Sequence, residues 1–198
     1  MWQGFFVLLI LVAPILADHH KHSMPADCSE IHHSSRGEYT IFPAGERSAV
    51  MSYCSQVMCD MDTDKGGWTV SMARLDGTVN FYRPWNQYKV GFGSPLSEHW
   101  IVGLDNLHYM TSNKKYELRV VLEDFDGKTA FANYGSFSVG DECSGYQLTV
   151  DGFSDGGAGD GLSSHNQMKF TTLDRDNDLY DKNCARLFLG AFWYNSCH

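Results

Sequence analysis

Six cysteines restrict how this 198-residue chain can fold. They are spread along the sequence, at positions 28, 54, 59, 143, 184 and 197. Their number alone does not give the pairing, because six cysteines can pair in many ways. A zinc site is disfavoured, since Cys54 and Cys59 lack the CxxC spacing and no second close pair with histidine completes a tetrahedral set. We therefore expect structural disulfides.

The amino terminus indicates the oxidising environment that disulfides need. Residues 1–17, MWQGFFVLLILVAPILA, form an apolar run that ends in the small residue Ala17 and precedes the polar residues DHHKH. The run is too short to span a bilayer and is typical of a secretory signal peptide. The run departs from the usual signal peptide in that it contains no Lys or Arg. A retained membrane anchor therefore stays open as a less favoured alternative. No later segment is apolar enough to cross a membrane, so we expect a secreted, extracellular protein.

Charge and length narrow the class of protein further. The chain has 15 Lys and Arg against 24 Asp and Glu, a formal net charge of −9. Such an acidic chain disfavours nucleic acid as a partner. Without the signal peptide, the remaining length suits one domain with a substantial core, or at most two small ones. We expect a flexible, polar tail over residues 18–27 and a single domain over residues 28–198.

The spacing of apolar residues predicts an α+β fold with an antiparallel sheet. The clearest strand covers residues 116–123, and the turn DFDGK joins it to a partner strand over residues 129–134. Further strands are expected at 38–42, 68–72 and 146–153. The best helix covers residues 97–109, with Ser97 as its candidate N-cap. Gly103 weakens that helix.

Catalytic motifs are missing from the sequence. Nucleophilic catalysis of the hydrolase type would need an activated Ser or Cys with a His base, but no GxSxG motif is present. The glycine-rich run DGGAGDG at residues 155–161 lacks the Lys and Ser/Thr of a phosphate-binding loop. We therefore expect a protein that is not an enzyme, with a secreted hydrolase as the disfavoured alternative.

One acidic stretch, LDRDNDLYDKNC at residues 173–184, is a candidate cation site. It places three aspartates at alternate positions: Asp174, Asp176 and Asp178. An EF-hand that began at Asp174 would need Gly and Glu where the chain has Leu179 and Ala185, so it is excluded. Two or three carboxylates with backbone carbonyls and water can still hold a hard divalent cation. On the stretch alone, a cation site and a solvated acidic turn are about equally supported.

Longer motifs run through the chain in a fixed order. They are DCSEI at 27–31, CDMDTDKGGWTV at 59–70, VNFYRPWNQYKVGFG at 79–93, KYELRVVLEDF at 115–125, DGGAGD at 155–160, DRDNDLYDKNCA at 174–185 and GAFWYNSCH at 190–198. With these motifs the chain resembles the fibrinogen-related domain family, and within it the microfibril-associated glycoprotein 4 type. The resemblance implies a fibrinogen C-terminal-like domain with a twisted antiparallel sheet, short helices and a loop-rich calcium- and ligand-binding part.

The resemblance also implies a calcium site. In the family the ion takes the second and third aspartates of the acidic stretch and two carbonyls further on. Carried over, the ligands are the side chains of Asp176 and Asp178, the main-chain oxygens of Tyr180 and Lys182, and water. Two carboxylates balance the charge of the ion, and so sparse a site is expected to bind calcium weakly. By the same comparison Asp174 is a neighbour of the site and not a ligand.

The family pairs its first two and its last two conserved cysteines, which implies Cys28 with Cys59 and Cys184 with Cys197. A bridge between the last two would close a short loop beside the acidic stretch and stabilise the fold by roughly 3 kcal/mol. Cys54 and Cys143 remain unassigned. They can pair with each other, stay free or join two chains, and a homo-oligomer is expected.

Family members with lectin activity bind acetylated sugars beside the calcium loop. The residues implied here are Phe188, a cis peptide between Ser196 and Cys197, and His198. Family members continue for several tens of residues beyond this point, and that segment completes the pocket. The chain is therefore expected to be a truncated form of the domain, as in a splice form or an incomplete sequence, and to bind acetylated ligands poorly.

Two functions follow from the resemblance. The favoured one is a secreted, non-enzymatic, calcium-binding adaptor of the extracellular matrix, with collagen or elastin and fibrillin microfibrils as partners. The alternative is a lectin of innate immunity, similar to ficolins and tachylectins, with acetylated glycans as ligands.

Overall fold

A computed structural model describes residues 5–15, 24–32, 35–44, 55–97 and 99–197. Its strands are β1 (Phe5–Pro14), β2 (Gly37–Ile41), β3 (Ser55–Asp60), β4 (Trp68–Arg74), β5 (Phe92–Ser94), β6 (His99–Ile101), β7 (Tyr116–Asp124), β8 (Thr129–Val139) and β9 (Leu148–Gly156). Its α-helices are α1 (Trp85–Val90), α2 (Leu104–Asn113) and α3 (Cys184–Phe188), and single 3-10 turns lie at Cys28–Glu30, Pro95–Ser97, Glu142–Ser144 and Ser163–His165. None of the helices in these ranges is long and apolar enough to span a bilayer.

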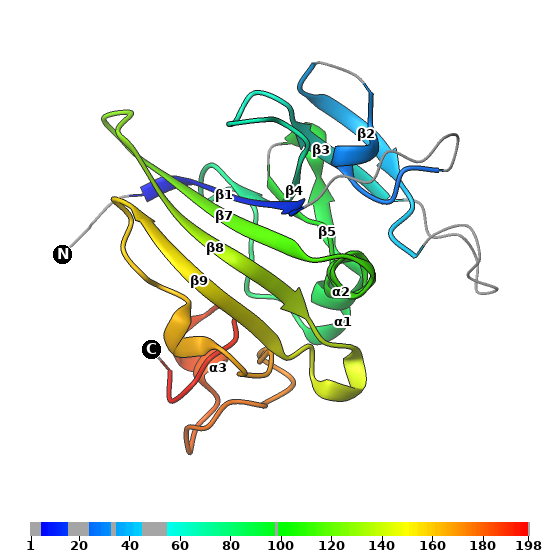
Figure 1. Cartoon of the computed structure of the whole chain (residues 1–198). Coiled ribbons are helices and arrows are strands. Elements are labelled where there is room, and N and C mark those ends of the chain that lie inside the picture. The colour runs from blue at the N-terminus through cyan, green and yellow to red at the C-terminus, as the bar shows by residue number, and fades with distance from the viewer. Residues whose placement is uncertain (1–4, 16–23, 33–34, 45–54, 98, 198) are drawn as a thin grey trace.

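The strands form one antiparallel sheet with the order β2-β3-β4-β1-β7-β8-β9. The β5–β6 hairpin joins it through β4. Helices α1 and α2 lie beside the sheet, and α3 lies with the long carboxy-terminal loops near β9 (Figure 1). The predicted α+β fold with an antiparallel sheet is therefore confirmed.

The core forms where the strands and α2 turn apolar side chains toward each other. In β8, alternate residues Ala130, Ala132 and Tyr134 are buried, as expected for a strand with one face on the core. Helix α2 packs against this strand and buries Leu107 and Met110. The buried Thr111 hydroxyl accepts a hydrogen bond from Val139 N at 3.1 Å and donates one to Leu107 O at 2.7 Å.

The helix predicted over residues 97–109 is wrong in its first half. Residues His99–Ile101 form strand β6, and the helix begins only at Leu104. Gly103 separates the two elements with φ of 94°, a conformation that favours glycine. A Cβ there would lie 2.6 Å from the carbonyl carbon of Val90, so the chain can make this close approach only with glycine. Tertiary packing thus overrides the helical spacing.

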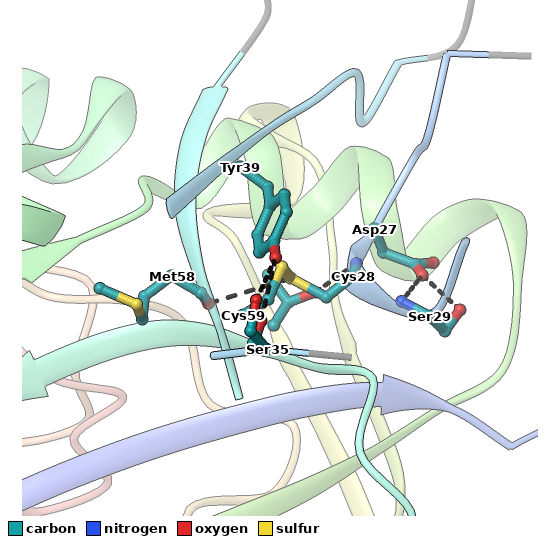
Figure 2. The surroundings of a disulfide bond; sticks show 8 residues. Asp27, Cys28, Ser29, Ser35, Tyr39, Met58 and Cys59 are labelled. Carbon is teal, nitrogen blue, oxygen red and sulfur yellow. Dashed lines mark hydrogen bonds between the residues drawn. A yellow bond between two sulfur atoms is a disulfide. The ribbon is translucent and has the colours of Figure 1, made fainter. Parts of the chain in front are cut away.

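The start of the domain is fixed by a disulfide and a buried carboxylate. Cys28 is bonded to Cys59 of β3, and the neighbouring Asp27 accepts a hydrogen bond from Ser29 N at 2.9 Å (Figure 2). Asp27 is fully buried, and its second oxygen accepts from the Tyr116 hydroxyl and from Lys114 Nζ. The flexible tail expected over residues 18–27 therefore ends before Asp27, while residues 18–23 lie outside the described part of the chain.

The apolar amino-terminal run occupies a place in the sheet. Its residues Phe5–Pro14 form β1, which pairs with β4 on one side and β7 on the other. The expectation that residues 1–17 are a signal peptide stays a prediction, because the structure does not test cleavage.

Candidate functional site

The acidic stretch is held in place by hydrogen bonds from its own backbone and from α3. Asp178 Oδ1 accepts from Tyr180 N at 3.1 Å, and Asp178 Oδ2 accepts from Cys184 N, at the start of α3, at 3.0 Å. The Asn183 side chain caps α3 by accepting from Arg186 N at 2.9 Å. Asp178 therefore has a fixed orientation between the loop and the helix.

Asp176 lies beside Asp178, and the negative charge of Asp178 disfavours ionisation of the Asp176 carboxyl. Burial, followed by the negative charge of Asp178, raises the pKa of Asp176 above its usual value. A backbone hydrogen bond from Asp178, and after it the positive charge of Arg186, act in the opposite direction and lower the pKa of Asp176. Two neighbouring carboxylates with little positive charge between them would be stabilised by a cation.

Asp174 has partners of a different kind. Its Oδ1 accepts from Trp85 N, the first residue of α1, at 2.8 Å, and from Thr172 Oγ1 at 2.7 Å. The Asp174 carboxylate thus joins the acidic stretch to the start of α1. The sequence placed Asp174 next to the cation ligands and outside their set, and this stays a prediction.

The donor atoms of the acidic stretch fit a hard cation. Within the described ranges, no hydrogen bond is made to the main-chain oxygens of Tyr180 and Lys182. Nor do those ranges contain a group of three or more His, Cys, Asp or Glu side chains that could hold a metal. A site here would therefore consist of two carboxylates, main-chain oxygens and water, which is a donor set suited to calcium and unsuited to zinc.

The second predicted disulfide ties this stretch to the carboxy-terminal segment. Cys184 is bonded to Cys197, 13 positions later in the sequence. Leu179 N also donates to Asn195 O at 2.9 Å. Both disulfides implied by the family resemblance are thus present. Cys143 is exposed and makes no disulfide within the described residues, and Cys54 lies outside them, so their pairing stays open.

An aromatic cavity lies beside α3, with a volume of about 510 Å³. Its wall includes Phe188 and the segment that follows it through Trp193. Further lining residues come from aromatic side chains and from strands β1 and β4, and they include Tyr82, Tyr88, Phe170, Ile10 and Met72. The ring of Phe170 packs edge-on against Trp193 with centroids 5.0 Å apart. This cavity can take an apolar or ring-shaped group, as ligand pockets of mixed aromatic lining do.

The other predicted ligand residues do not line this cavity. Ser196 is exposed, Cys197 is buried in its disulfide, and His198 lies outside the described residues. The described residues contain no cis peptide, so the Ser196–Cys197 bond is trans, contrary to the expectation. Only Phe188 of the predicted set lies on the cavity wall.

Sequence reasoning missed the residues that support the site from other parts of the chain. Trp85 donates from Nε1 to Glu142 Oε1 at 2.9 Å and lies under the guanidinium of Arg175, 4.0 Å from its ring centre. Glu142 also pairs with Lys89 of α1. The motif VNFYRPWNQYKVGFG contained Trp85 and Lys89, but nothing in it indicated that they contact residues more than fifty positions away.

Comparison with known proteins identifies the family to which this fold belongs. Residues 24–198 match the family model for the C-terminal globular domain of fibrinogen beta and gamma chains. The chain belongs to this family. The fibrinogen-like globe domain of human ANGPTL2 superposes with a TM-score of 0.79 and 39% identity, over 87% of this chain and 78% of that one. Lamprey fibrin D-dimer, solved with the peptide Gly-His-Arg-Pro-amide, gives a TM-score of 0.76 and 30% identity. The two cover 88% of this chain and 58% of the lamprey chain.

Two groups of relatives share the fibrinogen-like domain at about half identity. Human microfibril-associated glycoprotein 4 is 50% identical over 182 residues, covering 88% of this chain and 69% of the relative. Fibrinogen C domain-containing protein 1-B of Xenopus laevis is 47% identical over 89% of this chain, but only 39% of that relative is covered. The relatives are therefore longer than this chain. The resemblance to the microfibril-associated glycoprotein 4 type is confirmed.

Proposed function

We propose that this fibrinogen-like protein is a secreted, non-enzymatic, calcium-binding recognition module that acts as an adaptor in the extracellular matrix. The supporting observation is the side-by-side pair Asp176 and Asp178, fixed by α3 and tied through Cys184–Cys197 to an aromatic cavity. The 50% identity to a microfibril-associated glycoprotein favours matrix proteins as partners.

Calcium would act here as a structural ion. Bound by Asp176, Asp178 and the carbonyls of Tyr180 and Lys182, it would neutralise the two carboxylates and hold the loop against α3. Asp178 accepts a hydrogen bond from the first residue of α3, and Phe188, the last residue of that helix, lies on the cavity wall. The function supported is therefore binding, with the loop supporting α3 and α3 contributing its last residue to the cavity wall.

The test is retention on surfaces coated with collagen or tropoelastin, measured with calcium and with a chelator. We expect retention that the chelator reverses and that the pair Asp176→Asn and Asp178→Asn abolishes. Asp181→Asn is the matched control, because Asp181 is exposed in the same stretch and lies outside the expected ligand set. Retention that survives chelation and the double variant would contradict a calcium-dependent adaptor.

A lectin for acetylated carbohydrates is the second candidate, supported by Phe188 on the wall of the aromatic cavity. We expect weak or no retention on a resin carrying N-acetylated sugars, because Ser196 and Cys197 do not line that cavity. Strong retention that a chelator releases would favour the lectin over the adaptor.

A further inference from the structure

Several aspartates in this chain are followed directly by glycine, whereas no asparagine is. In an Asp-Gly pair the backbone nitrogen of the glycine can attack the side-chain carboxyl carbon of the aspartate, because glycine has no side chain to hinder the approach. The ring that forms is a succinimide, and its hydrolysis gives either aspartate or isoaspartate. The reacting groups must first be brought together, so the fold decides which pairs react. The five such aspartates are Asp76, Asp126, Asp151, Asp155 and Asp160.

At Asp151 a hydrogen bond brings the two reacting groups together. Gly152 N donates to Asp151 Oδ1 at 2.7 Å, so the nitrogen lies against the carboxyl group that it would attack. Gly152 lies inside strand β9 with φ of 72°, a conformation that favours glycine. The pairing of β8 with β9 passes from Asp151 to Phe153 and skips Gly152. The Gly152 N–H is therefore turned toward the side chain that precedes it.

Two of the other aspartates lie in the same part of the chain, but their carboxylates have different partners. Asp155 Oδ1 accepts from Gly157 N at 2.8 Å and from Gly159 N at 3.0 Å. Asp160 Oδ1 accepts from the Tyr134 hydroxyl at 2.9 Å. Within the described ranges, neither carboxylate accepts a hydrogen bond from the glycine that follows it.

The remaining two pairs are engaged in turns. Asp76 Oδ1 accepts from Thr78 N at 2.7 Å, two residues along the chain. In the pair Asp126–Gly127 the glycine N–H is already used, because it donates to Asp124 O at 3.0 Å. Among the residues that the structure describes, the contact that the sequence allows at five places is thus made at one.

The surroundings of Asp151 allow the reaction and limit the damage that it does. Asp151 and Gly152 are exposed, so water can reach the ring that has to be hydrolysed. Strand β9 is the last strand in the sheet order and lies outside β8 (Figure 1). Isoaspartate adds one backbone atom, which would shift Phe153 against Tyr134, where the ring centres are now 5.5 Å apart. The change would therefore affect the outer strand and leave the central strands in place.

We propose that Asp151–Gly152 is a site of spontaneous backbone modification, at which Asp151 converts to isoaspartate while the other four Asp-Gly pairs largely persist. Gly152 N forms a bond to Asp151 Cγ, and its proton leaves with the carboxyl hydroxyl as water. Water then opens the ring at the main-chain carbonyl of Asp151, so that the chain continues through the side chain. Nothing is oxidised or reduced, and no enzyme is needed, so the product accumulates with the age of the molecule. The site is independent of the calcium loop and goes beyond the adaptor function.

The proposal can be tested by ageing the folded full chain at mildly acidic pH and body temperature. Samples are digested with Asp-N endoproteinase, which cuts before aspartate and not before isoaspartate, and the peptides are quantified by mass spectrometry. We expect cleavage before Asp151 to be lost about tenfold faster than cleavage before Asp155. In guanidinium the two sites should convert at similar rates, because the fold no longer selects between them.

A matched pair of variants gives a second measurement. Asp151→Asn and Asp155→Asn each create an Asn-Gly pair in β9, which reacts through the same ring with loss of ammonia and a measurable gain in mass. Asp151→Asn should deamidate about tenfold faster than Asp155→Asn in the folded chain. The proposal is overturned if Asp151 reacts no faster than Asp155 in the folded chain. A preference for Asp151 that is equally strong in guanidinium would overturn it as well, since local sequence and not the fold would then be the cause.

Discussion

The backbone N–H of Trp85, at the first residue of α1, donates to Asp174 Oδ1 at a distance of 2.8 Å. Pro84 at the N-cap of α1 offers no side-chain hydrogen bond, so a carboxylate from a distant loop supplies one. This relationship gives Asp174 a structural role and separates it from the two aspartates that follow.

Replacing Asp174 should therefore affect stability and leave calcium binding largely intact. We expect Asp174→Ala to lower the free energy of unfolding by about 1–2 kcal/mol, as loss of a helix cap does. Asp176→Asn should show the opposite pattern, with calcium binding lost and stability in chelator nearly unchanged. Urea unfolding and calcium titration of both variants measure the two effects. Loss of calcium binding in Asp174→Ala at unchanged stability would assign Asp174 to the ligand set.

The buried Asp27 depends on the hydroxyl of Tyr116. Tyr116→Phe removes that donor and leaves Asp27 with Ser29 N, Ser29 Oγ and Lys114 Nζ. We expect a loss of about 1.5–3 kcal/mol, the range for a hydrogen bond to a charged group, measured by urea unfolding. Tyr109→Phe is the control, since Tyr109 is 41% exposed, and its loss should be under about 0.5 kcal/mol. Equal effects of the two variants would show that the hydroxyl contributes little.

Asp60 should make the stability of the fold depend on pH. Burial opposes its ionisation, but hydrogen bonds from Thr63 and Asp62 outweigh this and lower the pKa of the carboxyl below its usual 3.8. A carboxyl with a lower pKa in the folded chain stabilises the fold above the unfolded pKa, and this contribution is lost as the pH falls through the folded value. The stabilisation is therefore complete at neutral pH and lost below about pH 3.8.

We expect Asp60→Asn to be less stable than the unaltered chain by about 1–2 kcal/mol at pH 7. The difference should shrink as the pH falls below 3.8, as measured by urea unfolding across that range. Asp62→Asn, in the same turn but exposed, should show no such convergence. A difference that stays constant with pH would show that the Asp60 charge is not responsible.

Strand β1 should contribute strongly to stability wherever it is retained. In the uncleaved chain, we expect Leu11→Ala to cost about 2–5 kcal/mol, because Leu11 is fully buried among core residues. Ile15→Ala, just beyond the strand at a residue that is 47% exposed, should cost under about 0.5 kcal/mol. Thermal or urea unfolding compares them. Similar small losses would argue against β1 as a core strand.

Local patterns predicted several strands of this fold better than its helices. The alternation in residues 116–123 and 129–134 identified β7 and β8, because these strands bury one face and their turn joins them directly. The same reasoning assigned residues 97–109 to a helix, since it could not detect the contact between Gly103 and the end of α1. Helices α1 and α3 are too short to show a helical period.

The candidate site was predictable only where the sequence carried a motif. The acidic stretch was identified from its alternating aspartates, and the family resemblance implied its ligand set and the last disulfide. The structure shows how Asp178 and Cys184 meet. The support from Trp85 and Glu142 arises from contacts across the fold, which spacing in the sequence does not reveal. The trans bond before Cys197 departs from the family expectation, and nothing in the local sequence distinguished the two forms.

The position of β1 also bears on the order of events during synthesis. Val12 leaves the ribosome before either of its partners, Thr69 and Leu118, has been made. Until residues 116–124 emerge, this apolar segment has no complete binding place, and long-range pairing of this kind forms slowly. During that interval the segment is exposed. If residues 1–17 act as the export signal that the sequence predicts, the residues read for export are the same ones that the sheet encloses when they are retained.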